Sequence, residues 1–120
     1  MIEYLEYITR LTVQDNPDKI FLFGDNLLEK GFGGQAAAMR GEPNAIGIPT
    51  KKLPFNNSAA FFDDKEFEEN KKYIDEAFAK IPKDKIIVIP TAGLGTGRAK
   101  LDKKAPKTFA YLQSKLKTLK

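Results

Sequence analysis

Residues 86–98, IIVIPTAGLGTGR, decide the fold class of this chain. The four consecutive apolar residues at 86–89 are typical of a strand that is covered on both faces of a sheet. This strand runs into a loop with glycines at alternate positions, Gly93, Gly95 and Gly97. Glycine adopts positive φ and lets backbone amides approach a ligand without a Cβ in the way. The stretch therefore predicts a ligand-binding loop at the carboxyl end of a buried strand.

The rest of the chain alternates between strand and helix signals. The apolar pattern predicts strands over residues 2–9, 19–23, 44–48 and 86–89. Helix formers, apolar stripes and stop signals predict helices over residues 35–40, 65–80 and 106–119. Residues 51–64 have no clear period and predict a long loop. This order predicts a three-layer α/β fold, with a largely parallel central sheet and helices on both faces, in a single domain over residues 1–120.

Length and composition are those of one globular domain. The chain has 120 residues, of which 42% are hydrophobic, and a chain of this length buries a core without disulfides. No apolar run approaches the roughly 20 residues of a membrane-spanning helix. The first ten residues carry acids where a signal peptide carries bases. We therefore expect no membrane contact and a cytoplasmic location.

Two residue types that carry much of enzyme chemistry are absent. The sequence has no cysteine and no histidine. Thiolate nucleophiles, imidazole bases, Ser-His-Asp triads and zinc sites of Cys and His are therefore excluded. Any reaction must use carboxylates, lysines, hydroxyls, backbone amides or a metal bound through oxygen. We expect no cofactor, and we expect the acidic residues before and within the start of helix 65–80 to complement the helix dipole rather than to bind a metal.

All nine glycines fall in two zones, residues 24–47 and 93–97. Each zone contains a loop that leaves the carboxyl end of an apolar strand and precedes a helix. Because ligands bind beyond the carboxyl ends of parallel strands, the two loops predict one anion site that holds the two phosphates of a dinucleotide-like ligand. The alternative is that the glycines only make tight turns. The glycines assigned to the ligand are Gly24, Gly31, Gly33, Gly34, Gly93, Gly95 and Gly97.

Polar residues at the strand ends are the candidates for chemistry. Asp25 and Asn26 follow the first long apolar strand and are predicted to face the ligand, where they bond a sugar hydroxyl or orient a water; capping of a turn is the alternative. Gln35 either bonds the ligand or caps its helix. Thr50 and Thr91 end two strands in the same tripeptide, Ile-Pro-Thr, which predicts both hydroxyls at one rim.

Further candidates lie in the second glycine loop and in the long loop 51–64. Thr96 and Arg98 are assigned to the ligand, with Arg98 pairing a phosphate; a surface ion pair is the alternative for this arginine. The aromatic residues Phe55, Phe61 and Phe62 either stack an adenine or fill the core under the loop.

The net charge is +4, and much of the positive charge lies late in the chain. A basic last helix is usually a solvated face. The lesser functional alternative is a nucleic-acid binder that uses this helix. Its expected contacts are Lys103, Lys104 and Lys107.

These motifs resemble the macrodomain family of ADP-ribose binders. Macrodomains carry a strand that ends in Asn-Ala-Ala-Asn, then a leucine, a run of glycines and a helix. Residues 23–26, FGDN, followed by Leu28, the glycines at 31, 33 and 34 and the helix from Gln35, keep that order. Residues 88–99, VIPTAGLGTGRA, resemble the family's later strand, proline and loop around the diphosphate. The chain is also similar to small phage and bacterial proteins of unassigned function that carry FGDN or FGSN, GxGGxA, IPTK and GLGTG.

The resemblance implies a macrodomain-like fold that binds ADP-ribose or a related nucleotide. The asparagine of hydrolytic members corresponds to Asn26, and Asp25 stands where the family has an alanine. The resemblance therefore implies that Asp25 or Asn26 positions a water for hydrolysis of an ADP-ribosyl bond. The alternative is a binding module without turnover, which acts as a sensor or sponge for a cyclic ADP-ribose or cyclic dinucleotide signal in phage counter-defence.

Overall fold

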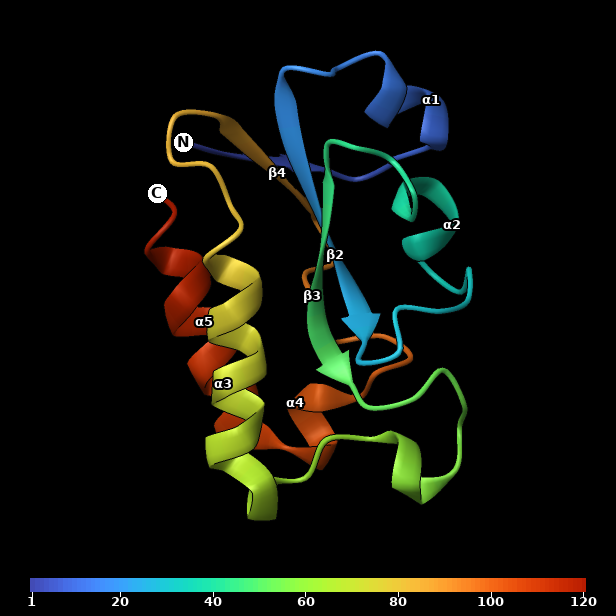
Figure 1. Ribbon diagram of the computed structural model, residues 1–120, viewed down its shortest axis with the longest axis vertical. Coiled ribbons are helices and arrows are strands. Elements are labelled where there is room, and N and C mark those ends of the chain that lie inside the picture. Colours follow the sequence, from blue (N-terminus) through green and yellow to red (C-terminus); the bar gives the residue numbers. More distant parts are fainter.

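The computed structural model describes all residues, 1–120, and is built around a four-stranded, all-parallel sheet with strand order β1-β4-β2-β3. The strands are β1 (Ile2–Leu5), β2 (Lys19–Asn26), β3 (Ala45–Lys51) and β4 (Ile86–Pro90). The helices are α1 (Arg10–Gln14), α2 (Ala36–Met39), α3 (Phe67–Phe78), α4 (Leu101–Lys104) and α5 (Pro106–Lys117), with short 3-10 turns η1 (Ser58–Ala60) and η2 (Asp64–Glu66). The predicted α/β class with helices on both faces is confirmed (Figure 1).

Alternation along β2 divides the core into two. Side chains of one parity, such as Ile20 and Leu22, pack with residues of α3, α4 and α5 in the larger cluster. Those of the other parity, Phe21 and Phe23, pack with residues of α1 and α2 in the smaller cluster. Successive side chains on a strand point to opposite faces. A strand that is apolar at every position therefore places apolar side chains on both faces of the sheet, and both faces must be covered. The molecule therefore has three layers, α1 and α2, then the sheet, then α3 and α5 (Figure 1).

The register places the ends of the two longest strands together. Residues 21–25 of β2 pair with residues 45–49 of β3, but Asn26 pairs with Lys51, so that Thr50 is an extra residue in β3. This bulge lies at the carboxyl end of the sheet, and such bulges commonly redirect side chains next to functional sites. β4 pairs with β2 on its other side, from Ile86 opposite Lys19. The loops after β2, β3 and β4 therefore leave the sheet at one edge.

A carboxylate joins the two long helices. Asp64 accepts hydrogen bonds at 2.9 Å from the backbone N–H of Lys107, from the backbone N–H of Thr108 and from the Thr108 hydroxyl, at the first turn of α5. Burial alone would raise the pKa of the Asp64 carboxyl, but these hydrogen bonds lower it below its ordinary value. Asn70 on α3 donates to the same Thr108 hydroxyl at 3.1 Å. The two neighbouring acids therefore have different roles: Asp63 caps η2, and Asp64 caps α5.

Asp64→Ala should lower the free energy of unfolding by about 1–2 kcal/mol at neutral pH, because it removes the cap of α5. A depressed carboxyl pKa contributes stability above the unfolded-state pKa, ordinarily 3.8, and this contribution is lost as the pH falls through the lower folded-state value. The free energies of unfolding of the variant and of the unmodified protein, measured with urea, should therefore differ less at about pH 3 than at pH 7. Asp63→Ala, which loses one bond in a single turn, is the control. A pH-independent difference would contradict this account.

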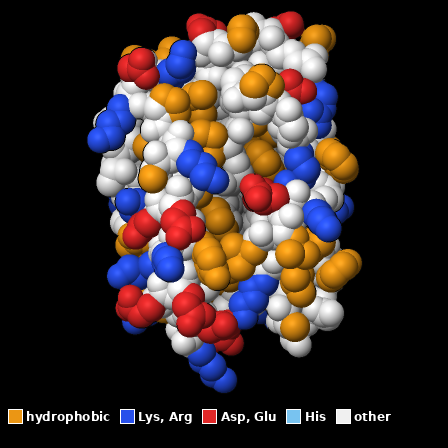
Figure 2. Space-filling model, viewed as in Figure 1, with side chains coloured by type: hydrophobic (Ala, Val, Ile, Leu, Met, Phe, Trp, Pro, Cys, Tyr) orange, Lys and Arg blue, Asp and Glu red, His pale blue; other side chains and the backbone are white.

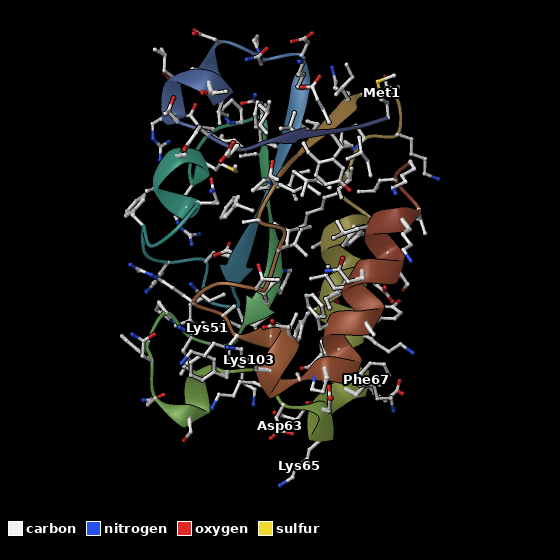
Figure 3. The ribbon with its side chains drawn as sticks, turned by 180° about the vertical axis from the view of Figure 1, so that it is seen from behind. Met1, Lys51, Asp63, Lys65, Phe67 and Lys103 are labelled. Atoms are coloured by element: carbon white, nitrogen blue, oxygen red, sulfur yellow. The ribbon has the colours of Figure 1, made fainter.

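Charges of both signs are interspersed on the face that presents β3 and α3, and acidic side chains gather around the start of α3 (Figure 2). Asp63 and Lys65 lie at this end of the molecule, next to Phe67 at the amino end of α3 (Figure 3). None of the helices combines the length and the apolar character that crossing a membrane requires.

Candidate functional site

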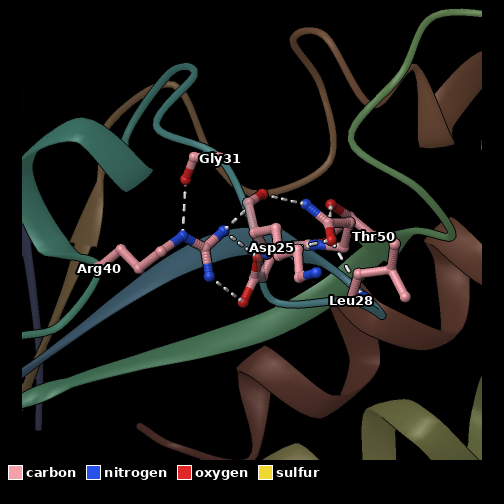
Figure 4. Close-up of polar contacts among 7 residues, drawn as sticks. Asp25, Leu28, Gly31, Arg40 and Thr50 are labelled. Atoms are coloured by element: carbon pink, nitrogen blue, oxygen red, sulfur yellow. Dashed lines mark hydrogen bonds and ion pairs between the residues drawn. The ribbon is translucent and has the colours of Figure 1, made fainter.

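The first glycine loop is shaped by Asn26, the last residue of β2. Its Oδ1 accepts hydrogen bonds from the backbone N–H of Leu28 at 3.0 Å and of Lys30 at 3.4 Å, and its Nδ2 donates to the Lys30 carbonyl at 2.8 Å (Figure 4). Asparagine commonly closes turns in this way. The loop leaves β2 in a fixed direction as a result. The amide of Asn26 is thus engaged by the backbone of its own loop.

Asp25 is the only buried carboxylate at the carboxyl edge of the sheet, and it is held by Arg40. The two guanidinium nitrogens donate to its two oxygens at 2.5 and 3.2 Å (Figure 4). Arg40 also donates to the Gly31 carbonyl at 2.6 Å and to the Lys30 carbonyl at 3.2 Å. Asp25 is 7% exposed. This bidentate pair fastens the first glycine loop to the end of α2.

Gly47 in β3 makes room for this pair. A Cβ at position 47 would lie 2.5 Å from Oδ2 of Asp25, closer than atoms can approach without displacement. Neither Gly47 nor Arg40 has a role that the sequence alone predicts. A glycine inside an apolar strand does signal close approach by another group, but nothing in the sequence identified Asp25 as that group.

The second glycine loop follows β4 and is closed on itself. Gly93 and Gly95 have φ of +86° and +83°, a region that glycine adopts without strain. The Gly95 carbonyl accepts from the backbone N–H of Leu101 at 2.8 Å, and the Thr96 hydroxyl donates to the Ala92 carbonyl at 2.8 Å. Leu94 and Leu101 are buried beneath the loop. The loop is therefore anchored by its own bonds and by the larger core.

The two glycine loops meet. The guanidinium of Arg98 from the second loop lies so close to Gly33 of the first that a Cβ there would be 2.6 Å from its Nη1. Deeper in the site, a Cβ on Gly24 would lie 3.8 Å from the Gly95 nitrogen and 3.1 Å from the Thr50 hydroxyl. The prediction that both loops lie at one edge of the sheet agrees with this geometry.

Two neighbouring cavities of about 260 and 250 Å³ open between the loops. Each is slightly below the usual size for a small-molecule site, about 300–1,000 Å³. They share a wall, however, and together they are within that range. The residues that line both are Gly24, Gly33, Thr50, Arg98 and Ala99.

The structure brings all but one of the predicted site residues to these cavities. The first cavity is lined by Gly24, Asp25, Asn26, Gly31, Gly33, Thr50 and Arg98. The second is lined by Gly24, Gly33, Gly34, Gln35, Thr50, Gly93, Gly95, Thr96, Gly97 and Arg98. The side chain of Gln35 makes no capping hydrogen bond at α2, so its amide remains available to a ligand.

Thr91 is the exception, and its position differs from the predicted one. It lines neither cavity, is exposed, and donates its backbone N–H to the Leu5 carbonyl at 2.9 Å. Thr50 is 2% exposed, and its hydroxyl donates to the Asp25 carbonyl at 3.3 Å. The repeated Ile-Pro-Thr therefore does not place two hydroxyls at one rim, because the bulge at Thr50 has no counterpart in β4.

The aromatic side chain at the site is one that sequence reasoning missed. Phe32, at the tip of the first glycine loop, lines the first cavity and is 64% exposed. Of the aromatic residues proposed for stacking, Phe61 and Phe62 are buried, while Phe55 is exposed but lines neither cavity. A large apolar ring that remains in solvent between two glycines is the feature that singles out Phe32.

The cavities are electropositive. Lys51, at the end of β3, lines the first cavity and is only 9% exposed. Burial, followed by the nearby charges of Arg98 and Lys100, lowers the pKa of the Lys51 ammonium below its ordinary value. Neither Lys51 nor Arg98 forms an ion pair with a carboxylate. The one acid of the site, Asp25, is already neutralised by Arg40. The arrangement suits an anion.

Carboxylates do not gather in a way that suits a metal ion. No group of three or more Asp or Glu side chains comes close enough to hold one. Near the start of α3, Asp63 and Asp64 are engaged in capping, and Glu66 forms an ion pair with Lys52.

Residues 3–115 match a protein family described as "Family of unknown function (DUF7831)". No curated protein and no solved structure is significantly similar to the chain. The matched region contains the whole sheet apart from the first residue of β1, both glycine loops and nearly all of α5. The chain therefore belongs to this DUF7831 family.

Proposed function

We propose that the protein binds ADP-ribose or a related nucleotide diphosphate between its two glycine loops, in the manner that the resemblance to macrodomains implies. The observation that carries this proposal is the contact of Arg98 with Gly33, because it joins the two loops across a pair of cavities. A free guanidinium among glycine backbone is a favourable partner for a diphosphate. The ring of Phe32 offers a face on which a base can stack.

The geometry favours binding over hydrolysis. Asp25 is paired with Arg40, and the Asn26 amide is bonded to the backbone of residues 28–30. These are the contacts of residues that shape a loop, whereas a group that orients a water needs a free acceptor or donor facing the ligand. Hydrolysis of an ADP-ribosyl bond is therefore the second candidate function. Binding without hydrolysis, the first candidate, is also what a sensor or sponge for a nucleotide signal would do.

Isothermal titration with ADP-ribose tests the proposal. Arg98→Met should weaken binding about tenfold or more, because a bidentate charged contact to phosphate is lost. Lys72→Met, which removes the same charge from an exposed position on α3, should leave the affinity unchanged. If the unmodified protein does not bind ADP-ribose, ADP or NAD, or if both variants lose affinity equally, the proposal fails. Incubation with an ADP-ribosylated peptide then decides between binding and turnover.

A further inference from the structure

Three lysine ammonium groups surround the ring of Phe61, next to the first cavity. The Nζ atoms of Lys51, Lys104 and Lys100 lie 4.9, 5.2 and 6.0 Å from the ring centroid. They come from three separate places in the chain, namely the end of β3, α4 and the residue before α4. None of them forms an ion pair. Lys100 and Lys104 are exposed, but Lys51 is buried, and a buried charge without a counter-charge is unfavourable unless a ligand of opposite sign completes the site.

Lys51 has unused hydrogen-bonding capacity in this cluster. Its ammonium has three donors, and the structure gives it one acceptor, Oδ1 of Asn56 at 3.3 Å. Arg98, which lines the same cavity, has five donors and no acceptor in the protein. Lys51 is buried, and buried polar groups normally use their hydrogen-bonding capacity, whereas Arg98 is exposed. The open donors of Lys51, together with those of Arg98 on the same cavity, therefore point to an anion with several oxygens.

Lys100 adds a strained backbone to the same place. Its φ is +48°, the left-handed region, and it is one of two non-glycine residues with positive φ in the protein. Residues held in this region cost free energy and cluster at functional sites. A lysine at a position better suited to glycine or asparagine indicates that its charge has a use there.

Resting on the proposed function, we propose that Lys51, Arg98 and Lys100 form a subsite for a third phosphoryl group, so that the preferred ligand is a nucleotide with one phosphoryl group beyond the diphosphate. The diphosphate occupies the cavities between the glycine loops, and the third group lies beside Phe61. That group is either the end of a linear triphosphate or a phosphate on a ribose. A phosphoryl oxygen accepts hydrogen bonds from the open donors of Lys51. The negative charge of the group offsets the mutual repulsion of Lys51, Arg98 and Lys100.

Paired ligands test this subsite. Calorimetry without magnesium, at one ionic strength, should show ATP binding about tenfold more tightly than ADP if the third group is terminal, or NADP about tenfold more tightly than NAD if it is on a ribose. In Lys51→Met and in Lys100→Asn this ratio should fall towards one. Asparagine tolerates the left-handed backbone at position 100. Lys103→Met is the matched control, because Lys103 lies on α4 directly before Lys104 but is not among the lysines over Phe61.

The outcomes separate the subsite from the proposed function. Equal affinities within both ligand pairs, or loss of the ratio in Lys103→Met as well, would overturn the subsite while leaving diphosphate binding in place. Absence of binding to all of these nucleotides and to ADP-ribose would overturn the proposed function itself. If a single-stranded oligonucleotide binds tightly and this binding depends on Lys51, the proposal that the ligand is a small nucleotide is wrong. Lys51→Met should fold at least as stably as the unmodified protein, since it removes a buried charge whose pKa is lowered.

Discussion

Arg40→Met should lower the free energy of unfolding by about 3 kcal/mol and should loosen the first glycine loop. The substitution leaves the Asp25 carboxylate buried at 7% exposure without its partner, against Gly47. It also removes the donors to the carbonyls of Gly31 and Lys30. Breaking one side of a buried pair is far more costly than replacing the whole pair. Chemical denaturation measures the loss of stability, and susceptibility of the loop to proteolysis measures its release.

Arg10→Met is the matched control for this experiment. Arg10 makes a comparable ion pair with Glu42 at 2.7 Å, but its side chain is 36% exposed, and exposed pairs contribute about 0–1 kcal/mol. The double variant with Asp25→Asn and Arg40→Met should recover part of the stability, because the uncompensated charge is gone. If Arg40→Met costs no more than Arg10→Met, Asp25 is not held in the way described.

This pair changes how a catalytic role for Asp25 must be tested. Asp25→Ala and Asn26→Ala both remove contacts that shape the first glycine loop. A loss of activity in either variant would therefore follow from a displaced loop as readily as from a missing catalytic group. Asp25→Asn keeps the size of the side chain and is the better variant. Its stability has to be measured before its turnover is interpreted.

The sequence predicted the layers of the fold but not the short helices α1 and α4. The apolar runs at 19–23 and 86–89 need cover on both faces, so a parallel sheet between helices follows from them. By contrast, α1 and α4 have five and four residues, too few to display a periodic stripe. β2 and β3 also extend past the predicted ends, because the buried polar residues Asp25, Asn26 and Lys51 continue the strand pairing.

The candidate site was predicted from its glycines and from Arg98 as a partner of phosphate, whereas the pairing of its other charges was not predicted. Glycine-rich backbone directly after an apolar strand is typical of a ligand-binding loop, so both loops could be recognised as candidates from the sequence. The contact between Arg40 and Asp25 depends on where α2 ends relative to β2, which no local pattern encodes. The same is true of Lys51 and Lys100, which meet at Phe61 although they are far apart in the chain. Spacing predicts which loops line the edge of the sheet, and only tertiary structure shows which charges are balanced there.

The second glycine loop allows a graded test of its shape by alanine substitution. Gly95→Ala should be the most damaging of the three, with a loss of about 2 kcal/mol or more, because it adds backbone strain to a steric conflict. Its φ is +83°, and its Cβ would lie 3.1 Å from both Cβ and Cδ2 of the buried Leu101. Since the loop rests on Leu101, either the leucine or the loop must move. Ligand affinity should be lost together with stability.

Gly93→Ala and Gly97→Ala separate the two causes. Gly93 has φ of +86°, but its Cβ would meet nothing closer than 4.0 Å, so its substitution measures strain alone, about 1–2 kcal/mol. Gly97 has neither a positive φ nor a neighbour within 4 Å, and Gly97→Ala should change stability by less than about 0.5 kcal/mol. Thermal denaturation and nucleotide titration of the series should give the order Gly95, Gly93, Gly97. Equal losses of stability and affinity at all three positions would mean that the loop is not held in one conformation. A loop fixed over Leu101 must be most sensitive at Gly95, the glycine that contacts this leucine.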